Sequence, residues 1–141
     1  MLNLAVRAPI AVALGAIAGA LGRYYISRWL MGWWMHSASA TAAPARDFPL
    51  GTFIVNASGC LLMGFATTIG DRLGLSPDIK LLLLTGGLGA YTTFSTYSLE
   101  AVALLNRGRL GIAGLYWVGS AIIGLGALQL GILLGRLGGR S

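Results

Sequence analysis

Four apolar stretches, each about as long as a membrane-crossing helix, decide what this chain can fold into. They cover residues 8–30, 50–70, 79–105 and 111–135 of the 141. A helix needs about 20 apolar residues to cross the hydrocarbon core of a bilayer. Only 10% of the residues are charged, whereas soluble domains carry about 25%. The sequence therefore predicts an all-α, multi-pass membrane protein in which residues 1–141 form a single domain with four transmembrane helices.

The basic residues are nearly balanced between the two sides that four spans would create. One side carries Arg7, Arg72, Lys80, Arg136 and Arg140, and the other carries Arg28, Arg46, Arg107, Arg109 and, if it reaches the interface, Arg23. The positive-inside rule then assigns no clear orientation, so insertion in both orientations is expected. The basic residues are scattered singly rather than gathered on one face, so no nucleic-acid partner is expected.

The third apolar stretch contains an unusual segment, TGGLGAYTT, at residues 85–93. Glycine disfavours helix and threonine is a weak helix former, so we expect the third helix to be interrupted within 86–93. Irregular backbone at membrane depth persists only where it lines a cavity or binds a ligand. The segment leads into a hydroxyl cluster that ends at the chain's one glutamate: Thr92, Thr93, Ser95, Thr96, Ser98 and Glu100. This combination predicts a functional site.

Small residues also recur at helix-packing spacing. Gly15 with Gly19, and Gly131 with Gly135, form GxxxG pairs. Small residues let membrane helices approach closely, and ordinary helix packing explains these glycines. The single cysteine, Cys60, is expected to be a small packing residue.

Three polar residues in the other spans have both a structural and a functional interpretation. The Asn56 amide can bond between helices, the Arg23 side chain can extend to the interface, and Ser120 can bond back to its own helix. Together with the hydroxyl cluster, they also supply the donors that a small anion needs.

Two rings follow the expected interruption and point to the same chemistry. Phe94 and Tyr97 are three residues apart and share one face of a resumed helix. The edge of an aromatic ring is positive, so it can contact an anion. Hydroxyls are expected in two rows on adjacent helix faces: Thr93 with Thr96, and Thr92 with Ser95. The pattern predicts a narrow anion path.

Two other functions fit the sequence less well. Catalysis is not expected, because His36 is the sole histidine, Glu100 is the one carboxylate within a span, and no nucleophile has an adjacent base. A small four-helix proton-coupled drug or cation exporter is the alternative, and it needs an acidic residue in the first span. Here the first span carries Arg23, which favours an anion.

Three motifs resemble those of the Fluc, or CrcB-type, fluoride channel family. They are GAIAGALGRYY (15–25), GTFIVNASGCLLMG (51–64) and GGLGAYTTFSTYSLE (86–100). With the four-span layout, the resemblance covers nearly the whole chain. It implies an antiparallel, dual-topology homodimer in the bacterial inner membrane, with two pores that export fluoride passively and so confer fluoride resistance.

The resemblance also implies which residues form the sites. A structural sodium ion would be bound by the backbone carbonyls of Gly89 and Thr92 from each chain. The implied pathway residues are Arg23, Asn56, Phe94, Ser95, Thr96, Tyr97, Glu100, Tyr116 and Ser120. Four of this chain's residues depart from the family pattern. Tyr97 stands where the family has phenylalanine and its hydroxyl can add a donor, Tyr91 replaces an aliphatic residue, Ala90 replaces a glycine, and Gly124 replaces a hydroxyl residue.

Overall fold

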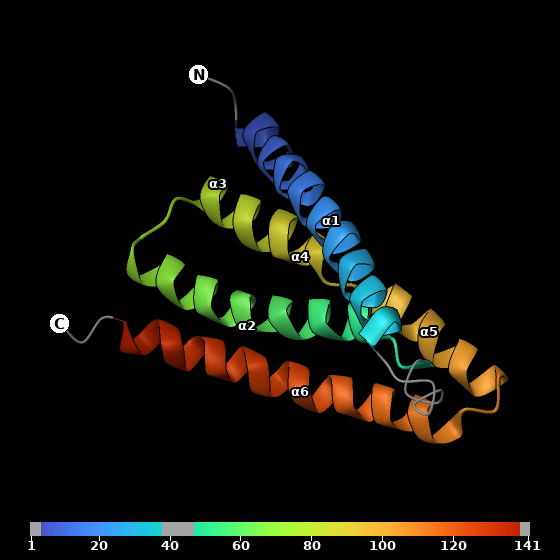
Figure 1. The fold of residues 1–141 in the computed structure, drawn as a ribbon. Helices are drawn as coiled ribbons and strands as arrows, with labels where there is room; N and C mark the ends of the chain where they lie inside the picture. Colours follow the sequence, from blue (N-terminus) through green and yellow to red (C-terminus); the bar gives the residue numbers. More distant parts are fainter. Residues whose placement is uncertain (1–3, 38–46, 139–141) are drawn as a thin grey trace.

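The structure is a computed structural model that describes residues 4–37 and 47–138. Its elements in the described residues are helices: α1 (Leu4–Ser37), α2 (Leu50–Arg72), α3 (Pro77–Lys80), the π-helix η2 (Leu81–Leu88), α4 (Gly89–Tyr91), α5 (Phe94–Asn106) and α6 (Leu110–Leu137). Figure 1 shows α2 and α6 side by side, α1 crossing over η2 and α4, and α5 continuing beyond the crossing. Residues 38–46, including Arg46, lie outside the described residues, as does Arg140, and α1 extends beyond the predicted end at residue 30 to Ser37.

The helices present an apolar surface of the kind that a membrane covers. Three of the described helices are long and apolar enough to cross a bilayer: Val6–His36, Leu50–Arg72 and Leu110–Leu137. Large side chains such as Leu125 and Trp117 are 70% and 62% exposed. The third apolar stretch differs, because its helix is divided into α3, η2 and α4 on one side and α5 on the other.

The division lies at Thr92 and Thr93, within the range that the sequence predicts. The preceding glycines do not break the helix themselves: Gly86 and Gly87 lie in η2, and Gly89 begins α4. Packing explains this difference, because a Cβ at Gly86 would lie 2.4 Å from the Val12 carbonyl oxygen of α1. The glycines allow this close contact, and the two threonines adopt the extended conformation.

Close backbone contacts through glycine hold the long helices together. A Cβ at Gly15 would lie 2.0 Å from the carbonyl oxygen of Leu82, and one at Gly19 would lie 2.0 Å from that of Gly87. Between α2 and α6, a Cβ at Gly131 would lie 2.1 Å from the carbonyl oxygen of Leu61. The predicted role of the GxxxG pairs in helix packing is therefore confirmed.

The turns at the two ends of the bundle use left-handed glycine. Gly74 and Gly108 have φ of 61° and 71°, and each follows the last turn of a helix, α2 and α5. The amide of Leu75 donates to the Gly70 carbonyl at 2.9 Å, and that of Arg109 donates to the Leu104 carbonyl at 2.9 Å. This is the Schellman arrangement, in which a glycine without a Cβ ends the helix.

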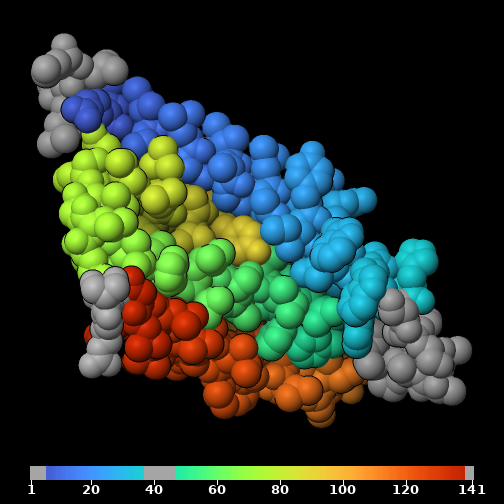
Figure 2. All heavy atoms as spheres, turned by 60° about the vertical axis from the view of Figure 1, so that its left-hand side comes forward, coloured from blue at the N-terminus to red at the C-terminus, as the bar shows by residue number. Residues whose placement is uncertain are grey.

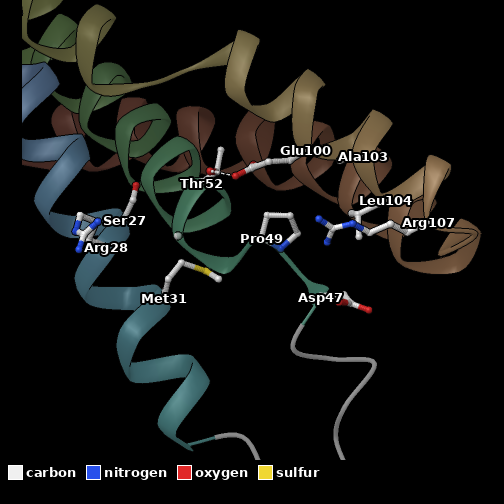
Figure 3. A pocket seen from close by; sticks show the side chains of 11 residues that line it. Ser27, Arg28, Met31, Asp47, Pro49, Thr52, Glu100, Ala103, Leu104 and Arg107 are labelled. Atoms are coloured by element: carbon white, nitrogen blue, oxygen red, sulfur yellow. Dashed lines mark hydrogen bonds between the residues drawn. The ribbon is translucent and has the colours of Figure 1, made fainter.

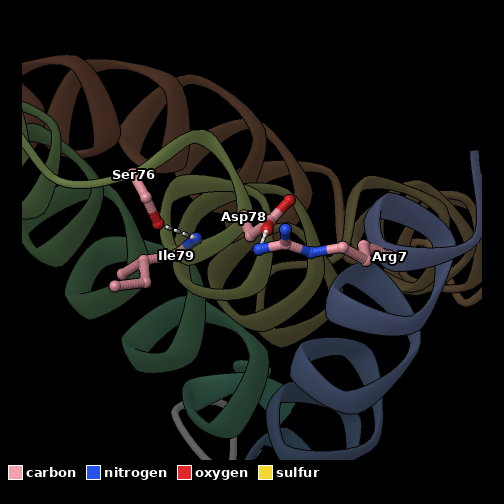
Figure 4. A network of polar contacts seen from close by, with 4 residues as sticks. All are labelled: Arg7, Ser76, Asp78 and Ile79. Atoms are coloured by element: carbon pink, nitrogen blue, oxygen red, sulfur yellow. Dashed lines mark hydrogen bonds and ion pairs between the residues drawn. The ribbon is translucent and has the colours of Figure 1, made fainter. Parts of the chain in front are cut away.

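Polar contacts tie the helix ends that meet at the α2–α3 turn. Ser76 caps α3 by accepting the Ile79 amide at 3.4 Å, and Arg7 of α1 forms an ion pair with Asp78 of α3 (Figure 4). Arg72 of α2 donates to the Gly135 carbonyl of α6 at 2.6 Å. The start of α1, the α2–α3 turn and the end of α6 therefore share one end of the bundle, where Figure 2 also brings α1, α3 and α6 into one view.

Candidate functional site

The helix break places two extended residues between α4 and α5. Thr92 has φ −78° and ψ 157°, and Thr93 has φ −146° and ψ 116°. The last carbonyls of a helix lack intrahelical donors. Such groups are costly in a membrane unless another partner satisfies them.

Asn56 on α2 holds the break through two hydrogen bonds to one residue. Its Oδ1 accepts the Thr93 amide at 2.8 Å, and its Nδ2 donates to the Thr93 carbonyl at 3.1 Å. The structural interpretation, in which the Asn56 amide bonds between helices, is therefore correct for its Oδ1 and for one hydrogen of its Nδ2. An amide nitrogen carries two hydrogens, so one donor remains for another partner.

The hydroxyl cluster forms a small network at the start of α5. Thr93 Oγ1 accepts the Thr96 amide at 3.2 Å and donates to Thr96 Oγ1 at 3.0 Å, and it lies 3.4 Å from Ser95 Oγ. Thr93 is buried, whereas Ser95 and Thr96 are exposed. The predicted row of Thr92 with Ser95 is wrong, because Thr92 is extended rather than helical and donates to the Leu88 carbonyl at 3.2 Å.

A groove of about 270 Å³ lies beside the break. We call it the break groove, and it is lined by Asn56, Cys60, Thr92, Thr93, Phe94, Tyr97, Ser120, Ala121 and Gly124. Ser120 Oγ is buried and has no hydrogen-bond partner among the described residues, so it does not bond back to its own helix. A buried hydroxyl without a partner is costly, and this one lines a groove that can hold a ligand.

The two aromatic rings meet at the break groove but differ in exposure. Their centroids lie 5.6 Å apart with an interplanar angle of 40°. The Phe94 side chain is 79% exposed and that of Tyr97 is 7% exposed. Tyr97 donates its hydroxyl to the Trp117 carbonyl at 2.8 Å. The expectation that this hydroxyl adds a donor to the path is therefore wrong, because the backbone of α6 already takes it.

Glu100 belongs to a second polar cluster and lies six residues after Phe94, the first residue of α5. Its Oε1 accepts the Thr52 hydroxyl at 2.9 Å and its Oε2 accepts the Tyr116 hydroxyl at 2.7 Å. The Tyr116 side chain is fully buried. Hydrogen bonds to an ionised carboxylate are short and strong, so this cluster fixes α2, α5 and α6 relative to one another.

The Glu100 cluster faces a cavity of about 390 Å³ at the end of the bundle opposite the α2–α3 turn. Figure 3 shows Glu100 reaching toward Thr52, with Arg107 further along α5. Arg28 of α1 also lines the cavity. Nearby, Arg109 Nε and Asp47 Oδ2 form an ion pair at 2.8 Å. The cavity is therefore lined by two basic side chains, Arg28 and Arg107, and by two carboxyl groups that already have partners, Glu100 and Asp47.

The structure divides the predicted site residues between the break groove, the exposed start of α5 and the Glu100 cluster, and it leaves Arg23 apart from all three. Asn56, Phe94, Tyr97 and Ser120 share the break groove, and Tyr116 contacts Tyr97 with ring centroids 5.1 Å apart. Arg23 lines neither the break groove nor the cavity beside Glu100. Its side chain is half-buried on α1.

Among the lining residues that sequence reasoning missed, Thr52 and Cys60 have a signal in the sequence. The stripe on α2 is Thr52, Asn56 and Cys60, and the matching stripe on α6 is Tyr116, Ser120 and Gly124. Residues four apart lie on one helix face, so the spacing from Asn56 identifies Thr52 and Cys60. A Cβ at Gly124 would lie 3.5 Å from Cys60 Sγ, so the thiol lies beside the position where the family pattern has a hydroxyl.

A family model described as CrcB-like protein, Camphor Resistance (CrcB), matches residues 10–132. This range contains the break, the break groove and the Glu100 cluster. The chain belongs to the CrcB family. As a CrcB protein with three helices that are long and apolar enough to cross a bilayer, it is a multi-pass membrane protein.

Relatives in the CrcB family match almost the whole chain. A protein of Trichormus variabilis named "Fluoride-specific ion channel FluC" is 49% identical over 137 residues, which are 96% of this chain and 93% of the relative. A protein of the same name from a Synechococcus species is 45% identical over 138 residues, covering 97% of this chain and 98% of the relative. A third, from a Synechocystis species, is 46% identical over 132 residues, covering 93% of this chain and 91% of the relative.

Proposed function

We propose that this protein is a fluoride-selective channel of the bacterial cell membrane that lets fluoride leave the cytoplasm passively. The observation that carries the proposal is the break groove. In it, the unpartnered Ser120 hydroxyl, the free Asn56 donor and the Phe94 ring lie together at a helix interruption. Relatives that are 45–49% identical are named as fluoride-specific ion channels.

The chemistry of the break groove suits a small anion. Its polar side chains offer N–H and O–H donors, and none of the residues that line it is a carboxylate. The Glu100 carboxylate lies in the neighbouring cluster, where both oxygens accept hydroxyls. The described residues of α1 include no aspartate or glutamate, which argues against a proton-coupled cation exporter.

Passive export is sufficient for protection from fluoride. Hydrogen fluoride crosses a membrane as a neutral molecule and ionises inside, so the membrane potential drives the trapped anion out through a channel. The chain has no GxxxxGK[ST] nucleotide motif, and the channel needs neither a coupled energy source nor a catalytic group.

Fluoride efflux from liposomes that contain only the purified protein tests this function. Vesicles loaded with potassium fluoride and treated with valinomycin should release fluoride quickly, because potassium then balances the charge. Vesicles loaded with potassium chloride are the control and should release little chloride. Transport that requires a pH gradient and moves an organic cation, without fluoride release, would instead identify an exporter.

The interrupted segment from α3 to α5 would form a fourth membrane crossing within each chain, and a second copy in the opposite orientation would complete the pore. Phe94, Ser95 and Thr96 are exposed beside the break groove. Hydroxyl groups at membrane depth are unfavourable against lipid, so a protein surface is expected to cover them. The balance of basic residues between the two ends supports an antiparallel dual-topology homodimer.

Labelling of an engineered C-terminal cysteine tests the dual topology. The replacement Cys60→Ala leaves the new thiol as the only one. In intact cells, we expect a membrane-impermeant maleimide to label about half of the molecules, and all of them after permeabilisation. Labelling of all or none of the molecules in intact cells would contradict insertion in both orientations.

We further propose that a sodium ion binds the carbonyls of Gly89 and Thr92. In a continuous α-helix the Thr93 amide would donate to the Gly89 carbonyl, but here it donates to Asn56. The peptide between Thr92 and Thr93 is trans, so the Thr92 carbonyl points away from Asn56. Outside the helices, no described residue donates a hydrogen bond to either oxygen, so both are open to a hard cation, which prefers oxygen ligands.

The described residues also support backbone rather than side-chain ligands for this ion. They contain no group of three or more His, Cys, Asp or Glu side chains that could hold a metal. Two carbonyls from one chain are too few for a hard cation, and a second copy would supply two more. The ion would be structural, because it would satisfy carbonyls that the break leaves without donors.

We expect sodium to stabilise the dimer against thermal dissociation in detergent, because a ligand that binds only the assembled state raises its stability. Sodium at 100 times its dissociation constant should raise the free energy of dimer dissociation by about 2.7 kcal/mol. N-methyl-D-glucamine at the same ionic strength is the control and should contribute nothing. Equal dissociation temperatures in the two salts would exclude the site.

A further inference from the structure

Tyr91, the last residue of α4, forms a hydrogen bond with α2 directly beside the helix break. Its hydroxyl lies 3.0 Å from Ser58 Oγ, and Ser58 Oγ donates to the Val55 carbonyl at 3.1 Å. A serine hydroxyl has one hydrogen, and the Val55 carbonyl takes it. The Tyr91 hydroxyl is therefore the donor in its bond to Ser58.

The Tyr91 ring occupies a slot between two glycines on different helices. A Cβ at Gly59 of α2 would lie 3.1 Å from Cδ1 of the ring, and a Cβ at Gly22 of α1 would lie 3.7 Å from Cδ2. The two glycines therefore face opposite edges of the ring. Packing fixes the position of the ring, and the bond to Ser58 fixes its outer end.

Two anchors to α2 consequently flank Thr92. Tyr91 is held on the side that precedes it, and Thr93 is held by Asn56 on the side that follows. The methyl group of Thr92 also lies against Gly59, where an added Cβ would be 2.3 Å away. The backbone from the end of α4 to Thr93 is thus fixed against one face of α2.

We propose that Tyr91 is a positioning residue, whose hydrogen bond to Ser58 holds the end of α4 so that the carbonyls of Gly89 and Thr92 are preorganised to bind a cation. This inference rests on the proposed sodium site. Preorganised ligands bind more tightly because less conformational freedom is lost on binding. The Tyr91 hydroxyl thus contributes to cation affinity without touching the ion.

Sodium titration of dimer stability in matched variants tests this role. Tyr91→Phe keeps the ring in its glycine slot and removes only the hydroxyl, and Ser58→Ala removes its partner. We expect each to raise the half-saturating sodium concentration about fivefold, the factor that corresponds to about 1 kcal/mol for one net hydrogen bond. Because both substitutions remove the same bond, the double variant should have nearly the same half-saturating sodium concentration as each single variant.

Tyr25→Phe is the control, since Tyr25 is 65% exposed and its hydroxyl bonds to no described residue. It should leave the half-saturating concentration unchanged. If Tyr91→Phe and Ser58→Ala lower stability equally at all sodium concentrations, the bond is merely structural and the positioning role is refuted. If sodium does not stabilise the wild-type dimer, the sodium site itself fails, and the positioning role fails with it.

Discussion

Phe94→Ile is expected to slow fluoride efflux at least about tenfold while the proposed dimer remains intact. The ring lines the break groove and is 79% exposed in a single chain. Isoleucine keeps an apolar side chain but removes the positive ring edge that can contact an anion. If the lost contact with the ring edge is assigned about 1.5 kcal/mol, the upper value for a pair of aromatic rings, its loss from the transport barrier corresponds to about a tenfold change in rate.

The alternative explanation of Phe94 is that it is only an aromatic residue facing lipid or a partner chain. In that case Phe94→Ile should transport fluoride at the wild-type rate, because an exposed ring contributes little to folding. Fluoride efflux from liposomes and size-exclusion chromatography of the same preparation separate the two explanations. A normally assembled Phe94→Ile variant that transports fluoride at the wild-type rate would show that Phe94 is not part of the fluoride pathway.

Tyr97 provides the matched series for this measurement. Tyr97→Phe keeps the ring and removes the hydrogen bond to the Trp117 carbonyl, so it should retain transport and lower stability by about 1 kcal/mol. Tyr97→Ile removes the ring from the groove and should slow transport. If both Tyr97 variants lose transport equally, the hydroxyl and not the ring is the important group.

Gly131→Ala is expected to destabilise the protein by about 3 kcal/mol or more, at or above the usual upper limit for overpacking. The added Cβ would lie 2.1 Å from the Leu61 carbonyl oxygen and 2.8 Å from the Phe65 amide nitrogen. These are backbone atoms of α2, so no side-chain rotation relieves the contact. The two helices must separate, and their packing is lost along the whole interface.

Gly126→Ala, on the same helix, is the control for this prediction. A Cβ at Gly126 meets nothing within 4 Å, and alanine favours helix over glycine by about 1 kcal/mol. Thermal unfolding in detergent should therefore show a lower midpoint for Gly131→Ala and an equal or higher midpoint for Gly126→Ala. Equal effects of the two substitutions would mean that the close contact between α2 and α6 is not present in the protein.

The sequence by itself determined the features that depend on neighbouring residues. Apolar stretches identified the helices, because a helix that crosses the hydrocarbon core needs about 20 consecutive apolar residues. The spacing of Gly15 with Gly19 and of Gly131 with Gly135 identified faces of close packing. The run at 85–93 indicated where the third helix is interrupted, since consecutive poor helix formers weaken a helix locally.

The tertiary structure decided which side chains meet, because the rotation and register of each helix are set by contacts between residues far apart in the chain. Asn56 bonds to the extended Thr93 across a separation of 37 positions. The Tyr97 hydroxyl bonds to α6 rather than facing the path, and Ser120 is left without a partner. Polar side chains can bond locally or across helices with similar energies, so only the packed helices determine which bond forms.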